Sequence, residues 1–200
     1  MSGAGARLEV VPVRHAETEW SLSGRHTGLT DIPLTDAGRA TAKALAARVG
    51  QWSFERVLVS PLRRARETCE LCGLGDRAEV CEELHEWDYG EYEGLTTAQI
   101  HAVRPDWNLW RDGCPGGEDA QQVGARADRV LAMVGGVQGA VAAFSHGHIL
   151  RVLGARWIEL SPTCGGRLGL SAGAVSALGY ERDTRILHLW NDAGRAHALE

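Results

Sequence analysis

Apolar and polar positions along the chain follow two patterns. Short apolar runs, typical of buried strands, occupy residues 8–13, 57–60, 79–81 and 140–145. Between them, apolar residues recur at helical spacing in segments that begin at residues 35, 62, 96, 118 and 149. The tail alternates as a β-hairpin does, over residues 174–180 and 185–189. Strands that alternate with helices predict an α/β fold around a mostly parallel sheet.

Two of the predicted strands end at histidines. Arg14 and His15 follow the first strand, and the strand over residues 140–145 leads directly into His146-Gly147-His148. Open α/β sheets bind ligands at the carboxyl ends of their strands. These side chains are therefore candidates for one binding site. The alternative is that they are surface residues at which a strand ends.

Two other segments gather basic side chains. Residues 21–34 are rich in Gly, Ser and Thr, which predicts a loop, and residues 25–27 offer several hydrogen-bond donors. The helix that begins at residue 62 opens with three arginines within residues 63–66. The helix dipole disfavours cations there unless an anion lies among them. The alternatives are a solvated turn and an exposed run of charges.

Acidic and aromatic residues interleave over residues 84–94, where four carboxylates alternate with three aromatic rings. An apolar ring beside a carboxyl group disfavours its ionised form, which suits a general acid near neutral pH. The alternative is a set of exposed acids beside packed rings. The loop over residues 105–117 holds Trp107 and Trp110, which predict either a satellite core or a lid over a pocket.

Composition narrows the class of ligand. The chain has 200 residues, 44% of them hydrophobic, which predicts a single domain over residues 1–200 with a sizeable core. Its formal net charge of −5 argues against nucleic acid and against an anionic membrane as partners, because both bind basic patches. Lys43 is the only lysine among 21 basic residues. Arginine binds phosphate and carboxylate through paired hydrogen bonds, so a small anion is the favoured ligand.

The five cysteines are an odd and scattered set, which predicts reduced thiols. Cys69 and Cys72 have CxxC spacing, but no second pair accompanies them and they fall in a predicted helix. This favours buried apolar packing over a metal or redox site. The segment Met1–Arg7 lacks the layout of a signal peptide, and no apolar run approaches the length of a membrane span. The sequence therefore predicts a soluble, cytoplasmic protein.

Together these segments resemble the histidine phosphatase superfamily, in its phosphoglycerate mutase-like branch, over essentially the whole chain. The matching motifs occur in the family's order: Arg14-His15-Ala16-Glu17-Thr18, Ser60-Pro61-Leu62-Arg63-Arg64-Ala65-Arg66-Glu67-Thr68, Glu86-Trp87-Asp88-Tyr89-Gly90 and Ser145-His146-Gly147. The resemblance implies a three-layer α/β/α sandwich with a mostly parallel central sheet. Ala16 departs from the family's glycine and adds a methyl group beside His15.

The resemblance also implies catalytic roles. His15 is expected to be the nucleophile, because a neutral imidazole approaches a phosphate dianion without repulsion. Arg14, Arg64 and His146 are expected to surround the equatorial phosphate oxygens. Glu86 is expected to protonate the leaving group and then to activate water.

Further implications concern the substrate and the cofactor. Arg64 is preferred to Arg63 as the phosphate ligand, because it directly precedes the alanine of the motif. The resemblance implies neither a metal nor another cofactor. Trp107 and Trp110 are expected over the mouth of the pocket, and a second anionic or polyhydroxy group of the substrate near the loop over residues 24–34. The expected substrate contacts are Ser21, Arg25, Thr27 and Gly28.

Hydrolysis is favoured over phosphate transfer. Mutases of the family carry a long insertion between the acidic residue and the second histidine, whereas here that stretch runs only from Glu86 to His146. The motifs lie closest to acid phosphatase and sugar-bisphosphatase members. We therefore expect a metal-independent phosphomonoesterase acting on a small phosphorylated metabolite such as a sugar phosphate, with a homodimer as one expected assembly. Two alternatives stay open: a phosphoglycerate mutase, and a catalytically weak phosphate-binding protein with Ala16 as the lesion.

Overall fold

A central sheet runs through the computed structural model, which describes residues 7–194. Within these residues six strands pair in the order β3-β2-β4-β1-β5-β6. The strands are β1 (Glu9–Arg14), β2 (Phe54–Val59), β3 (Ala78–Val80), β4 (Ala140–Ser145), β5 (Val175–Glu181) and β6 (Thr184–Asp192). Strands β3, β2, β4 and β1 are parallel, and the antiparallel hairpin β5–β6 extends the sheet beyond β1. The predicted mostly parallel sheet is confirmed.

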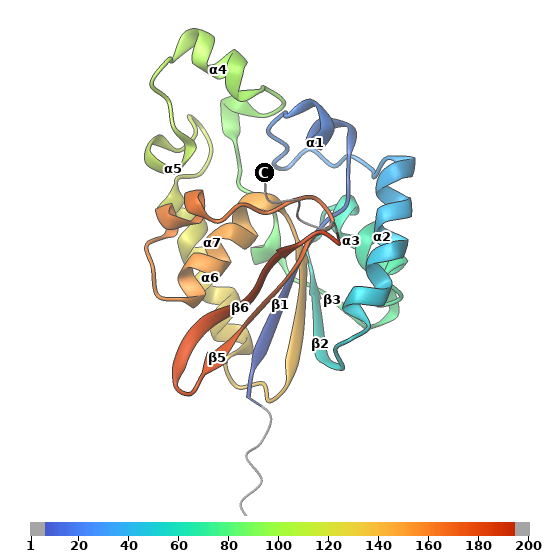
Figure 1. The fold of residues 1–200 in the computed structure, drawn as a ribbon. Helices are drawn as coiled ribbons and strands as arrows, with labels where there is room; N and C mark the ends of the chain where they lie inside the picture. Colours follow the sequence, from blue (N-terminus) through green and yellow to red (C-terminus); the bar gives the residue numbers. More distant parts are fainter. Residues whose placement is uncertain (1–6, 195–200) are drawn as a thin grey trace, which may run out of the picture.

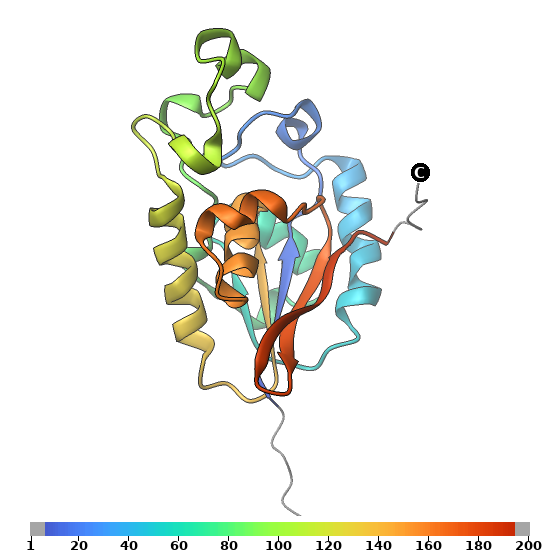
Figure 2. The ribbon, with the colours of Figure 1, turned by 60° about the vertical axis from the view of Figure 1, so that its left-hand side comes forward.

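Helices cover both faces of this sheet (Figures 1 and 2). The α-helices are α1 (Glu19–Ser23), α2 (Asp36–Val49), α3 (Arg63–Leu71), α4 (Thr97–Val103), α5 (Leu109–Asp112), α6 (Ala120–Val134) and α7 (Gly147–Trp157). The short 3₁₀ helices are η1 (Gly75–Arg77), η2 (Glu82–Leu84), η3 (Gly90–Tyr92) and η4 (Pro162–Arg167). Helices α2 and α3 lie on one face and α6 and α7 on the other, which confirms the three-layer sandwich.

The strands are apolar on both faces because both faces are buried. In β1, Val11 and Val13 belong to the core shared with α2 and α3, whereas Val10 belongs to the core shared with α6 and α7. In β4, Phe144 and Val141 divide between the same two cores. Parallel strands covered on both sides show such continuous apolar runs. The helical layers on both faces therefore hold the strands in place. Helices α1, α4 and α5 lie above the edge of the sheet at which β1 and β4 end (Figure 1).

The structure corrects several predicted boundaries. Residues 19–23 form α1 inside a segment read largely as loop, because Thr18 and Ser21 cap its first turn with reciprocal side-chain-to-backbone hydrogen bonds. Helix α6 begins at Ala120, not at Glu118, because the Asp119 carboxylate accepts two amide hydrogen bonds at its start. Helix α5 lies within the predicted loop over residues 105–117, and α7 begins two residues before its predicted start.

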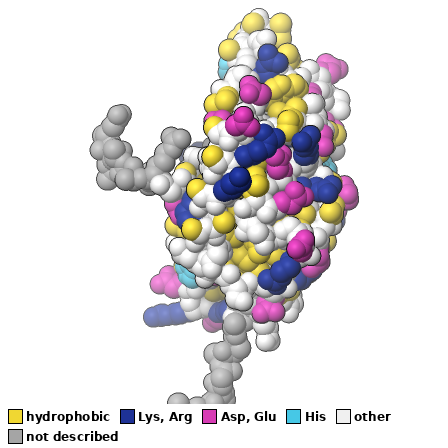
Figure 3. All heavy atoms as spheres, turned by 90° about the vertical axis from the view of Figure 1, so that its right-hand side faces the viewer, with side chains coloured by type: hydrophobic (Ala, Val, Ile, Leu, Met, Phe, Trp, Pro, Cys, Tyr) yellow, Lys and Arg dark blue, Asp and Glu magenta, His cyan; other side chains and the backbone are white. Residues whose placement is uncertain are grey.

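The structure bears on some of the remaining predictions about the class and compartment of the protein and leaves others untested. All five cysteines are free, and burial raises the pKa of the Cys69, Cys72 and Cys114 thiols to about 12. No helix within residues 7–194 combines the length and apolar character needed to cross a membrane. Basic, acidic and apolar side chains mix on the face seen in Figure 3. The predicted lack of a signal peptide falls mainly on residues 1–6, outside the described residues, and the single-domain assignment stays a prediction.

Candidate active site

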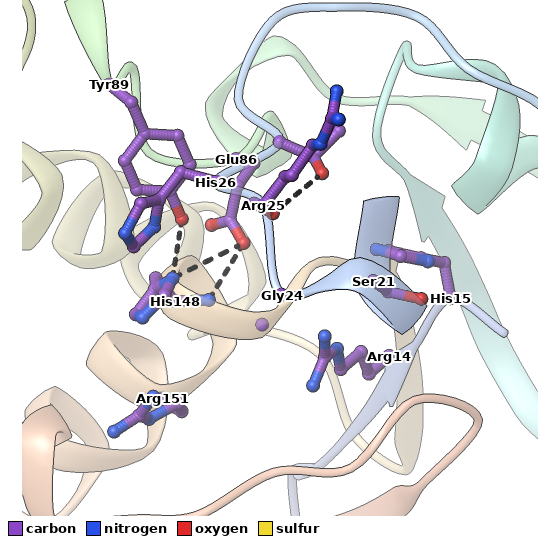
Figure 4. Close-up of a pocket in the computed structure, with 12 residues that line it drawn as sticks. Arg14, His15, Ser21, Gly24, Arg25, His26, Glu86, Tyr89, His148 and Arg151 are labelled. Carbon is purple, nitrogen blue, oxygen red and sulfur yellow. Dashed lines mark hydrogen bonds and ion pairs between the residues drawn. The ribbon is translucent and has the colours of Figure 1, made fainter. Parts of the chain in front are cut away.

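A cavity of about 180 Å³ opens at the carboxyl ends of β1 and β4 (Figure 4). That volume equals about six water molecules, so it suits a small ligand. The lining side chains come from β1, the segment after it, residues 86–89 and α7. They are Arg14, His15, Ser21, Gly24, Arg25, His26, Thr27, Glu86, Tyr89, Gly147, His148 and Arg151. Most of the predicted site residues thus meet at one place, although they lie far apart in the sequence.

The His15 ring is held as a neutral imidazole. Its backbone N–H donates to the Ser145 carbonyl at 2.9 Å, which ties it to the end of β4. Its Nδ1 lies 2.7 Å from the Ala16 carbonyl and donates to it, so Nε2 is left without a proton. Burial lowers the pKa of His15 well below 6.5, and the nearby Arg64 and Arg14 lower it further. The unprotonated Nε2 is the atom that a nucleophile requires.

The Arg14 side chain is half-buried, and its Nε is a buried hydrogen-bond donor without a partner among the described residues. Its Nη1 donates to the Leu170 carbonyl, whereas its Nε has no hydrogen-bond partner among the described residues. A Cβ at Gly147 would lie 3.3 Å from the guanidinium carbon, so the glycine gives Arg14 the room to lie against α7. A buried donor without a partner is costly in a folded protein and marks a site that awaits an acceptor.

Arg64 and His146 lie directly behind the His15 ring. The His15 and His146 ring centroids are 5.2 Å apart, and Arg64 Nε donates to His146 Nδ1 at 3.0 Å. His146 Nε2 therefore carries the proton and donates to Ser60 Oγ at 2.7 Å. The other donors of Arg64 reach the carbonyls of residues 27, 28 and 30. Both side chains are fully buried, and His146 positions Arg64 without offering a free N–H to the cavity.

The Glu86 carboxylate lies at the start of α7. It accepts hydrogen bonds from the backbone amides of Trp87, His148 and Ile149 at 2.9 to 3.0 Å. These three donors fix the position of the Glu86 carboxylate at the edge of the cavity. The backbone of Glu86 is held in turn by Arg126, whose guanidinium donates to the carbonyls of residues 83, 85 and 86 and pairs with Glu118 at 2.7 Å.

Comparisons with known proteins agree with this geometry. Residues 10–193 match the family described as "Histidine phosphatase superfamily (branch 1)". The chain belongs to this superfamily. An acid phosphatase of Mycobacterium tuberculosis is 41% identical, with 88% of each chain covered. A sedoheptulose 1,7-bisphosphatase of Saccharomyces cerevisiae is 37% identical, with 74% of this chain and 66% of that protein covered.

A solved structure shares the fold of this histidine phosphatase. The structure of the open reading frame Rv3214 of Mycobacterium tuberculosis superposes with a TM-score of 0.89 and 39% identity. The match covers 94% of this chain and 98% of that chain. The family, the fold and the phosphatase class predicted from the sequence are confirmed.

The predicted substrate contacts of the histidine phosphatase divide into two groups. Ser21, Arg25 and Thr27 line the cavity, and the Arg25 side chain is exposed over the Trp20 ring. Gly28 does not join them. It is buried behind the loop, where its N–H donates to the Glu93 carboxylate and its carbonyl accepts from Arg64.

The Ala16 methyl group points away from the cavity. Ala16 is fully buried in a small apolar cluster with Leu34 and Ala42, and its N–H donates to Thr68 Oγ1 at 3.1 Å. Its backbone is not among the residues with a left-handed conformation, so this position does not require a glycine. The methyl group therefore fills core space and does not crowd the phosphate position.

The sequence pattern marks His148 as a candidate site residue but assigns no role to Tyr89 or Arg151, which complete the outer wall of the cavity. Tyr89, His148 and Arg151 line the cavity, and the Tyr89 hydroxyl lies 2.5 Å from His148 Nδ1. The signal that could have found them is helical spacing, because residues 148 and 151 share one face of α7. Trp107 and Trp110 do not line the mouth as expected. They pack behind it, against His26 and His148.

No group of three or more His, Cys, Asp or Glu within residues 7–194 is arranged to hold a metal ion. The positive charge around His15 comes instead from arginine. The expectation that no metal takes part stays a prediction.

Proposed function

We propose that this histidine phosphatase hydrolyses the phosphate monoester of a small metabolite, a sugar phosphate by class, through a phosphohistidine on His15. The observation that carries the proposal is the pairing of a neutral His15 imidazole with a buried, unsatisfied Arg14 Nε in one cavity. Together they supply a nucleophile and a donor for a tetrahedral anion. A homodimer and a cytoplasmic location are part of the same proposal.

The first step transfers the phosphoryl group to the enzyme. His15 Nε2 attacks phosphorus, and the bond between phosphorus and the ester oxygen breaks. Arg14 lines the cavity and stabilises the charge that spreads over the equatorial oxygens, and the buried Arg64 adds its positive charge from behind the His15 ring. Glu86 gives a proton to the departing alkoxide.

The second step restores the enzyme. Glu86, now ionised, accepts a proton from water as that water attacks phosphorus. The bond between phosphorus and Nε2 breaks, inorganic phosphate leaves, and His15 returns to the neutral imidazole that Ala16 orients. Neither step requires a metal, so we expect a chelator to leave the rate unchanged.

Phosphate release from p-nitrophenyl phosphate tests the proposal. We expect turnover by the wild type and a loss of about 10⁴-fold in kcat in His15→Ala. His188→Ala, on the edge strand β6 outside the cavity, is the matched control. A wild type that releases no phosphate, or a His15→Ala variant as active as the control, contradicts it. Exchange between phosphoglycerate isomers that needs a bisphosphorylated primer, without phosphate release, would assign a mutase instead.

A further inference from the structure

A buried serine contacts the histidine that orients Arg64. Ser60 follows β2, and its backbone N–H donates to the Phe144 carbonyl at 2.9 Å, which places it beside the end of β4. Its side chain is fully buried and does not line the cavity. The Ser60 hydroxyl lies 2.7 Å from His146 Nε2, and it also accepts the Leu62 N–H at 3.3 Å. It thus joins the ends of two parallel strands to the start of α3.

Arg64 decides which nitrogen of His146 carries the proton. A guanidinium only donates hydrogen bonds, and Arg64 Nε donates to His146 Nδ1 at 3.0 Å. Nδ1 is therefore unprotonated, and the proton of the neutral ring lies on Nε2. Burial and the neighbouring Arg64 lower the pKa of His146 well below 6.5, which agrees with a neutral ring. The buried Nε2–H needs an acceptor, and Ser60 Oγ supplies it.

The opposite tautomer of His146 would break its contact with Arg64. A proton on Nδ1 would face the N–H of Arg64 Nε, so two donors would meet at 3.0 Å. The other donors of Arg64 reach carbonyls in the loop over residues 27–30, and its charge acts on the His15 ring, whose centroid is 5.2 Å from that of His146. The position of this charge therefore depends on the tautomer of His146, and the tautomer depends on the acceptor at Nε2.

We propose that Ser60 is a positioning residue, whose hydroxyl oxygen holds His146 in the tautomer with the proton on Nε2 and so fixes the Arg64 guanidinium behind the His15 ring. The inference rests on the proposed hydrolysis, because it gives Ser60 a part in the rate of phosphoryl transfer without contact with the substrate. Ser176 of β5 offers the comparison. It is equally buried and its hydroxyl accepts the Asn191 N–H at 3.1 Å, but no hydrogen bond among the described residues links it to His146.

Kinetics with p-nitrophenyl phosphate measure the effect on catalysis. Ser60→Ala removes the acceptor, and we expect kcat to fall by about tenfold and KM to change by less than about threefold, because Arg64 acts on charge that develops in the transition state. Ser60→Cys keeps the shape with a weaker acceptor and should behave as Ser60→Ala does. Ser60→Thr keeps the hydroxyl and should retain the wild-type kcat to within about threefold. Ser176→Ala is the control and keeps the wild-type kcat.

Nuclear magnetic resonance of isotopically labelled histidine side chains reads the tautomer directly. In the wild type we expect His146 to carry its proton on Nε2 and none on Nδ1. In Ser60→Ala we expect a proton on Nδ1 or a mixture of the two tautomers. The His146→Gln variant identifies the signals by their loss. Ser60→Thr and Ser176→Ala should both keep the wild-type signals of His146.

Melting curves report whether each variant is folded, and if Ser60→Ala does not fold, the same criteria apply to Ser60→Cys. If wild-type His146 carries its proton on Nδ1, or if Ser60→Ala keeps the wild-type tautomer, the role of Ser60 is wrong even where kcat falls. It is also wrong if Ser60→Ala keeps the wild-type kcat, or if Ser176→Ala loses as much activity. Failure of the wild type to hydrolyse p-nitrophenyl phosphate contradicts the hydrolytic function itself, a separate result, because the tautomer is measured without turnover.

Discussion

The two ends of the cavity are built by different means. At one end Arg14 and His15 extend from β1, and their backbone amides donate to the carbonyls of Ala174 and Ser145, so the sheet fixes their positions. At the other end Tyr89, His148 and Arg151 are held by contacts between side chains that pack on Trp110 and on one another. The comparison teaches that the sheet fixes the residues proposed to carry the phosphate chemistry, whereas side-chain packing around α7 builds the opposite wall of the cavity.

The two ends of the cavity also differ in how much their polar groups reduce the stability of the folded protein. The phosphate end holds an arginine whose buried Nε lacks a partner among the described residues and two histidines kept neutral by burial. Groups arranged in this way reduce stability until a ligand pairs with them. The outer end is better satisfied, because Arg151 already donates to two carbonyls and stacks on a ring. The two ends should therefore respond differently to mutation.

The largest effect is expected at the phosphate end. Replacement of Arg14 by Met removes a phosphate donor, and we expect kcat/KM to fall by about 10²- to 10³-fold. The same change removes an unsatisfied buried group, so the free energy of unfolding should rise by about 1 kcal/mol. Phosphate-release assays and urea unfolding measure the two effects. A variant that loses both activity and stability would show that Arg14 supports the fold.

The next largest effect is expected in residues 83–86, the segment that joins the two ends of the cavity. Arg126→Met frees the carbonyls of residues 83, 85 and 86 and leaves the partly buried Glu118 without its partner. We expect the free energy of unfolding to fall by about 3 kcal/mol. We also expect kcat to fall about tenfold for an alkyl phosphate, which needs a proton from Glu86, and less for p-nitrophenyl phosphate. Equal losses for both substrates would argue against a role in positioning Glu86.

A smaller and graded effect follows from pH. Burial lowers the pKa of His15, His146 and His148 well below 6.5 in the folded protein, so the unfolded chain binds more protons below pH 6.5. The free energy of unfolding is therefore at its maximum above pH 6.5 and decreases as the pH drops below it. For each histidine, the unfolding equilibrium constant rises by up to about tenfold per pH unit. Urea midpoints at pH 7.5 and 5.5 measure this. His146→Gln should give a shallower dependence.

The smallest effect is expected at Ala16. Because its methyl group packs against Leu34 and Ala42, Ala16→Gly should change kcat/KM by less than about threefold and lower the free energy of unfolding by about 1 kcal/mol. Kinetics and urea unfolding of this variant decide between an active phosphatase and a weak phosphate-binding protein. A gain in activity of orders of magnitude would favour the binding protein.

The sequence predicts the phosphate end well and the outer end poorly, for a physical reason. Arg14, His15 and His146 follow apolar strand runs, and parallel strands end at one edge, so the pattern alone brings them together. The place of Arg151 in the cavity wall depends on how α7 packs on Trp110 and on residues 165–166, which no local pattern encodes. The same holds for Glu86, whose carboxylate is held in position by amides of α7 far along the chain.

The buried thiols affect how the protein responds to oxidants. With a pKa near 12, the thiols of Cys69, Cys72 and Cys114 are almost never thiolates at neutral pH, and hydrogen peroxide reacts with the thiolate form. In the proposed mechanism the reacting atom of the enzyme is a ring nitrogen, that of His15. Oxidant at a level that inactivates enzymes with a cysteine nucleophile should therefore leave this enzyme active.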